Sequence, residues 1–231
     1  MLIFLVLGVL LPWRGRARIR KLLALPRVTS AERLALYAST ITFQWLAVAV
    51  TAWRAWARGL TLSELGLMIP IGGRIVTVAL AGALLFGTLH WLNLRRMSRV
   101  APEARGLLQA LAERIVPRST VERVVYLALA LTAGLCEEFL YRGFVMAALT
   151  RAGFPVWMVV ALSAILFGLA HLYQGRGGLL STLVFGVAFG VARIAYDSLA
   201  PVILWHVTVD VVAGLAGPSY LLTGERGLPP S

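Results

Sequence analysis

The stretch of this sequence most suited to chemistry is Cys136–Arg142, which reads CEEFLYR inside a long apolar run. Ionisable groups are costly in membrane hydrocarbon, so a chain keeps them only where they face protein or a water-filled cavity. On a helix Glu138 and Arg142 are four residues apart with the acid first, so they can pair and neutralise each other. Glu137 lies about 100° around the helix on another face. It is therefore a spare buried carboxylate and a candidate base.

Two later apolar segments carry polar side chains at helical spacing. Phe167 and His171 are four residues apart in one segment, and His206 and Asp210 are four apart in another. Residues at this spacing share one face of a helix. Peptide hydrolysis needs a base to deprotonate water, and donor or positive groups where the carbonyl oxygen becomes negative. Imidazoles and carboxylates can fill both roles, whereas Phe167 is expected to pack as a wall.

The composition indicates an integral membrane protein. Of the 231 residues, 59% are hydrophobic and 14% are charged, against about 25% charged in a soluble domain. The net charge of +12 comes mostly from arginines between the apolar segments, where positive loops set topology and contact anionic lipid. We therefore expect membrane lipid, and no nucleic acid, as a partner. The single cysteine, Cys136, excludes an internal disulfide and a cysteine cage for a metal.

The apolar segments predict an all-α fold, a polytopic transmembrane helix bundle of six full spans plus a short N-terminal anchor. The predicted spans are residues 34–53, 74–94, 124–149, 156–173, 179–196 and 201–222. Met1–Trp13 forms the anchor and is short for a complete crossing. Arg14–Arg33 is basic and interrupted by Pro26, so it is expected to be a cytoplasmic connection. Gly186 and Gly190 have the small-xxx-small spacing that lets membrane helices approach closely.

Together the polar residues resemble the motifs of a known family. They occur in order on successive predicted helices as Glu137-Glu138-xxx-Arg142, Phe167-xxx-His171 and His206-xxx-Asp210. This pattern is similar to that of the CPBP family, the CAAX prenyl protease and bacteriocin-processing (Abi) intramembrane proteases, over about residues 124–217. The resemblance implies that Glu137 and His171 activate the attacking water, with His206 and Asp210 on the oxyanion side. The family's third motif often ends in Asn where this chain has Asp210.

The resemblance divides the chain into three regions. They are an N-terminal anchor with two spans and basic cytoplasmic loops (1–123), a CPBP-like catalytic core (124–222) and a polar tail (223–231). Within the core, Glu138, Arg142 and Phe167 are expected to support the site by pairing and packing.

The sequence leaves two mechanisms for water activation open. Glu137, His171 and His206 could form a two-His, one-carboxylate zinc site with an open position, and the family is often described as metalloprotease. The HExxH helix of soluble zinc proteases is absent, and a metal-independent glutamate mechanism uses the same residues.

The leading interpretation is an intramembrane endopeptidase acting on a membrane-associated peptide or protein, prenylated at a CAAX-type end or not. An ion- or proton-coupled transporter also places Glu, His and Asp inside spans, although no inverted repeat is apparent. A non-catalytic immunity or scaffold protein is a third reading. The Arg-rich and Ala-rich composition favours a bacterial plasma membrane.

Overall fold

The computed structural model describes residues 6–69 and 72–222, and every regular element in those ranges is a helix. The predicted all-α bundle is therefore confirmed, while the first residues of the predicted anchor and the polar tail lie outside the described residues. The elements are η1 (Val6–Leu10), α2 (Leu11–Ala24), α3 (Ser30–Ala57), α4 (Gly73–Met97), η2 (Pro102–Arg105), α5 (Leu107–Ile115), α6 (Thr120–Glu138), η3 (Phe139–Val145), α7 (Met146–Arg151), α8 (Val156–Ala170), η4 (Leu172–Gln174), α9 (Gly175–Tyr196) and α10 (Ala200–Leu221).

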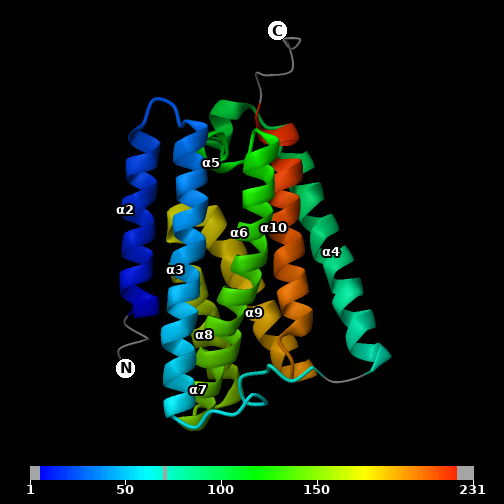
Figure 1. Cartoon of the computed structure of the whole chain (residues 1–231). Coiled ribbons are helices and arrows are strands. Elements are labelled where there is room, and N and C mark those ends of the chain that lie inside the picture. Colours follow the sequence, from blue (N-terminus) through cyan, green and yellow to red (C-terminus); the bar gives the residue numbers. More distant parts are fainter. Residues whose placement is uncertain (1–5, 70–71, 223–231) are drawn as a thin grey trace.

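Among the described residues, five helical stretches are long and apolar enough to cross a membrane. They are Ser30–Ala57, Gly73–Met97, Thr120–Arg151, Leu172–Tyr196 and Ala200–Leu221. The sixth predicted span, 156–173, differs, because α8 has only 15 residues and ends at Ala170. Gly175 then adopts a φ of 78°, which glycine tolerates without strain, and the chain reverses into α9. In Figure 1 this turn lies inside the height of the bundle, short of the end where α3 and α6 begin.

The N-terminal segment is helical further than its sequence predicts. The sequence predicts a connection over Arg14–Arg33, yet α2 continues through most of the basic residues to Ala24. The reason is that Arg is a good helix former, and the first strong breaker is Pro26, which disfavours helix at the residue before it. Near the start of this segment, Leu7 is 2% exposed and packs into the main hydrophobic cluster. The described part of the anchor is thus a packed element of the bundle.

Close helix packing brings the elements of the site together. Helix α10 packs against both α4 and α6, and α3 packs against α6 (Figure 1). A Cβ atom on Gly134 of α6 would lie 3.2 Å from the backbone nitrogen of Val207 and 3.3 Å from the carbonyl oxygen of Ile203. Only a glycine allows α6 and α10 to approach this closely. The approach carries the end of α6 to the side of His206.

Helices α8 and α9 form a second close pair. A Cβ atom on Gly186 would lie 2.9 Å from Cβ of Ala164, and one on Gly190 would lie 3.1 Å from Cγ1 of Val160. The close helix approach predicted from the small-xxx-small spacing of Gly186 and Gly190 is therefore confirmed, and α8 packs directly against α9.

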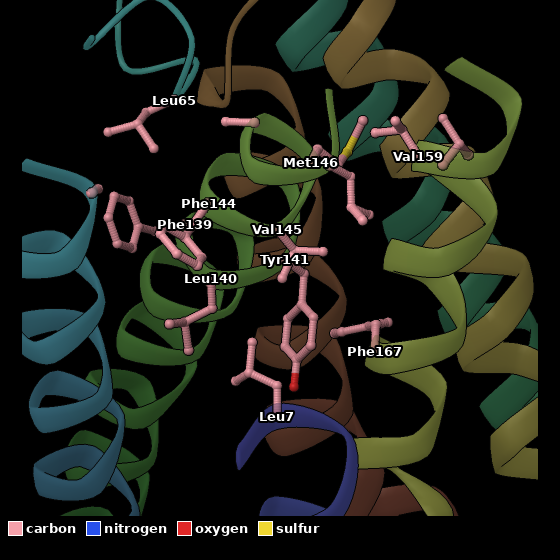
Figure 2. Close-up of a cluster of buried hydrophobic side chains, with 14 residues drawn as sticks. Leu7, Leu65, Phe139, Leu140, Tyr141, Phe144, Val145, Met146, Val159 and Phe167 are labelled. Atoms are coloured by element: carbon pink, nitrogen blue, oxygen red, sulfur yellow. The ribbon is translucent and has the colours of Figure 1, made fainter. Parts of the chain in front are cut away.

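The long helix 120–151 changes its geometry directly after the two glutamates. Residues Phe139–Val145 form a π-helix between α6 and α7, and all seven are buried. π-Segments are rare and occur frequently at functional sites. Figure 2 shows this segment at the centre of the main hydrophobic cluster, with Tyr141 pointing toward Leu7 and Phe167 beside it. The ring centroids of Tyr141 and Phe167 are 5.3 Å apart, which fixes α8 against the π-helix.

Candidate active site

Three helices each contribute one polar side chain to the same site. Glu137 lies in the last turn of α6, His171 is the C-cap of α8, and His206 lies in the first half of α10. Nε2 of His171 is 3.7 Å from Oε2 of Glu137, and Nε2 of His206 is 3.9 Å from that same oxygen. The three side chains are only 10–17% exposed. The structure therefore gathers one carboxylate and two imidazoles in a shared, largely buried site.

The orientation of His171 is set by its own helix. Its Nδ1 lies 2.9 Å from the backbone carbonyl oxygen of Phe167. A carbonyl oxygen can only accept a hydrogen bond, so Nδ1 carries the hydrogen. In the neutral ring Nε2 then holds a lone pair, and it faces Glu137. The FxxxH spacing thus fixes both the tautomer and the direction of this imidazole.

His206 is held by the second glutamate. Its Nδ1 lies 2.7 Å from Oε1 of Glu138, and Nη1 of Arg142 lies 3.0 Å from the same oxygen. The side chains of Glu138 and Arg142 are 0% exposed. The pairing of Glu138 with Arg142 follows from their spacing. The contact between Glu138 and His206 joins two different helices, so the spacing of residues within one helix does not predict it.

Arg142 also connects the two histidine-bearing regions. Its Nη2 donates to the carbonyl oxygen of Gly186 at 3.5 Å, and its Cζ lies 4.2 Å from the ring centroid of Phe167. A guanidinium over an aromatic face is attracted by the ring's quadrupole. The Phe167 ring in turn lies 4.6 Å, centroid to centroid, from that of His171. Phe167 therefore packs between the buried cation and the imidazole.

Asp210 joins the site through His206. Its Oδ2 lies 3.7 Å from Nε2 of His206, and the Asp210 side chain is 32% exposed. It sits one helical turn from His206 on α10, as its spacing predicts. An ionised carboxylate can only accept hydrogen bonds. Here it supplies negative charge beside the imidazole.

One residue that contacts the site belongs to none of the sequence motifs. Nε2 of Gln44, in α3, donates a 2.7 Å hydrogen bond to Oε1 of Glu137. The available signal was an amide in the middle of an apolar predicted span. Gln44 has no motif partner in the sequence, because the residue it meets lies on a different helix.

The side chains predicted as zinc ligands are the three that meet at this site. In the parts of the chain that the structure describes, no three His, Cys, Asp or Glu side chains are placed to hold a metal ion. Nε2 of His171 and Nε2 of His206 both lie near Oε2 of Glu137, so the zinc site and the metal-independent glutamate mechanism both stay predictions that use the same donors.

The fold and the site define a polytopic helical membrane protein with buried glutamates and imidazoles in its core. Residues 119–212 match the family described as Rce1-like, type II CAAX prenyl endopeptidase. This match confirms the resemblance to the CPBP family over that segment, which is less than half of the chain, and it supports an intramembrane protease in general. The segment holds all seven residues singled out from the sequence motifs. No curated protein and no solved structure matches the chain.

Proposed function

We propose that this protein is an endopeptidase in which Glu137 and His171 activate a water molecule inside the membrane. The observation that carries the proposal is the convergence of two imidazole nitrogens from separate helices on one oxygen of Glu137, at 3.7 and 3.9 Å. Three polar groups do not meet inside an apolar bundle by chance, because each is costly there.

The reaction follows from the atoms at this point. Oε2 of Glu137 takes a proton from water, and the water oxygen forms a bond to the carbonyl carbon of the substrate. Nε2 of His171, an acceptor in the neutral ring, lies beside that carboxylate and shares the proton. When the tetrahedral intermediate collapses, the carbon–nitrogen bond breaks. The proton held at Glu137 and His171 then passes to the leaving amine.

His206 serves the carbonyl oxygen of the substrate. Its Nδ1–H is engaged by Glu138, so Nε2 becomes a donor when the ring is protonated. A protonated imidazole directed at the developing oxyanion stabilises the transition state. Asp210, 3.7 Å from Nε2, balances the charge of that imidazolium. We assign Asp210 to the oxyanion side as the partner of His206.

The proposed substrate is a membrane-associated peptide or protein, in the first instance one with a prenylated CAAX-type end, because residues 119–212 match a CAAX endopeptidase family. The proposed location is a bacterial plasma membrane, where the arginine-rich ends of the helices contact anionic lipid. Nucleic acid has no part in the proposal, because most of the arginines lie between the apolar segments, where positive charge sets topology and contacts anionic lipid.

The test is hydrolysis of an internally quenched peptide by the purified protein in detergent, with farnesylated and unprenylated versions compared. We expect wild type to cleave and Glu137→Gln to lose turnover, because the amide keeps the shape but is no base. Glu103→Gln, at an exposed acid of η2, is the matched control and should retain wild-type turnover. Equal turnover in Glu137→Gln would overturn the proposal. Absence of cleavage together with Glu137-dependent proton flux in liposomes would favour a transporter.

A further inference from the structure

Gln44 brings the N-terminal half of the chain into contact with the proposed base. It lies near the middle of α3, outside the segment that matches the protease family. Its Nε2 donates to Oε1 of Glu137 at 2.7 Å. An amide donor at this distance fixes the carboxylate plane, so it also fixes where the second oxygen of Glu137 points.

Glu137 and Gln44 each have a second oxygen that accepts no hydrogen bond from the described residues. Oε2 of Glu137 and Oε1 of Gln44 are both buried, and neither accepts a hydrogen bond from any described residue. Buried polar atoms are normally satisfied by protein or by ordered water. A hydrogen-bonded pair whose two remaining oxygens both need a donor is matched by one small molecule that donates two hydrogens. Water is that molecule.

We propose that Gln44 is a positioning residue for the hydrolytic water. In this arrangement the water donates one hydrogen to Oε2 of Glu137 and the other to Oε1 of Gln44. Its lone pair is then directed away from both side chains, toward the substrate carbonyl. This inference rests on the proposed function, and it adds a water site built by α3 and α6 together.

The chemistry of an amide suits this role better than the alternatives. An amide offers a donor and an acceptor from one planar group and carries no charge, so it can hold a carboxylate and a water at once. A glutamate at position 44 would keep the acceptor but place a second negative charge against Glu137. A leucine would keep much of the volume and supply neither hydrogen bond.

The first measurement separates kcat from KM on the peptides described above. We expect Gln44→Leu to lower kcat by about tenfold to hundredfold while KM changes by less than about twofold, because the water and not the substrate is misplaced. Gln44→Asn keeps the amide on a shorter stem and should recover part of that loss. Thr42→Val, at an exposed position of the same helix, is the control and should match wild type. An unchanged kcat in Gln44→Leu, or a raised KM at constant kcat, would overturn the proposal.

A second measurement does not depend on activity. The thermal unfolding of wild type, Gln44→Leu, Glu137→Leu and the double variant forms a double-mutant cycle. We expect the two losses in Tm to be non-additive, because the second substitution removes a contact already lost. Additive losses would overturn the contact, and with it the positioning role. If wild type cleaves neither peptide the proposed function fails, and the cycle alone then decides whether Gln44 holds Glu137.

Discussion

Nδ1 of His206 lies 2.7 Å from Oε1 of Glu138, and that oxygen also accepts from Arg142. One buried carboxylate thus holds a cation on its own helix and an imidazole on α10. The two glutamates of the EExxxR motif therefore make different contacts. Oε2 of Glu137 lies near the imidazoles of His171 and His206, whereas Glu138 holds both Arg142 and His206.

Removal of the Glu138 carboxylate should destabilise the fold. Glu138→Ala leaves Arg142 without its charge partner at a site that is 0% exposed, and breaking a buried ion pair costs about 3–5 kcal/mol. Glu138→Gln keeps an acceptor for His206 and should cost less. Reversible unfolding in mixed detergent measures both losses. The control is Glu113→Ala, which removes a half-exposed partner of Arg114 and should change little. A Glu138→Ala protein as stable as the control would contradict the buried role.

The two histidines in transmembrane helices α4 and α10 should differ sharply in their effect on turnover. His206→Ala removes the group assigned to the oxyanion and should lower kcat by about 10²–10⁴-fold. His90→Ala is the matched control, because His90 lies on α4 and the imidazoles that contact Glu137 are those of His171 and His206. Its kcat should stay close to that of wild type. Equal losses in the two variants would mean that the effect is structural, and the oxyanion assignment would then be wrong.

The sequence could predict the members of the motif cluster, because each was an anomaly in its own segment. Glu137, His171 and His206 are ionisable groups in apolar runs, and such groups must face protein or water. Gln44 is less costly and belongs to no motif, so its partner could be found only once α3 and α6 were placed side by side. Contacts between distant helices are a tertiary property that local spacing does not contain.

The position of the site along the height of the bundle is a second property that residue spacing in the sequence does not predict. Ideal spans place His171 late in one crossing and His206 early in another, and at 1.5 Å per residue this separates them in depth. The structure resolves the difference by ending α8 at Ala170 and turning the chain inside the bundle. Gly175, with its positive φ, makes the reversal possible. The glycines at positions 175, 177 and 178 indicate a turn in this region, but they do not indicate how deep in the bundle the turn lies.

Chelation tests the metal reading directly. Glu137 and His171 can activate water without a metal, and on that mechanism we expect cleavage to persist after prolonged dialysis against EDTA. Elemental analysis of the dialysed protein serves as the control for metal removal. Loss of activity on dialysis, with recovery on adding Zn²⁺, would instead make Glu137 and the two imidazoles a metal site.

The close packing of α8 on α9 should be intolerant of added volume. A Cβ at Gly186 would lie 2.9 Å from Cβ of Ala164, so Gly186→Val must push the helices apart, and overpacking typically costs about 1–3 kcal/mol. The same shift moves the carbonyl that accepts from Arg142. Gly177→Ala is the control on the same helix, because its Cβ would meet nothing within 4 Å. Thermal unfolding should rank Gly186→Val below Gly177→Ala, and the reverse order would contradict the packing.

Glu64 links the loop after α3 to Arg151, which is the last residue of α7. The carboxylate of Glu64 accepts from Nε and Nη2 of Arg151 at 2.6 and 3.0 Å. The hydrogen bond from Arg151, followed by those from the backbone and hydroxyl of Thr61, lowers the pKa of Glu64 from 4.5 to about 2. Because the folded pKa is the lower one, the ionised carboxylate stabilises the fold above about pH 4.5. This contribution is lost as the pH falls through the folded value of about 2.

The Glu64–Arg151 pair predicts a gap in Tm between wild type and Glu64→Gln that depends on pH. The gap should be constant from pH 7 to about 5 and should narrow as the pH falls from about 4.5 toward 2. Both partners are at least one-third exposed, so the gap should also shrink in high salt. Glu103→Gln, at an exposed acid for which the structure gives no ion pair, is the control and should show no such trend. A gap that widens on acidification would contradict the lowered pKa, because it would mean that the neutral form of Glu64 is the one the fold prefers.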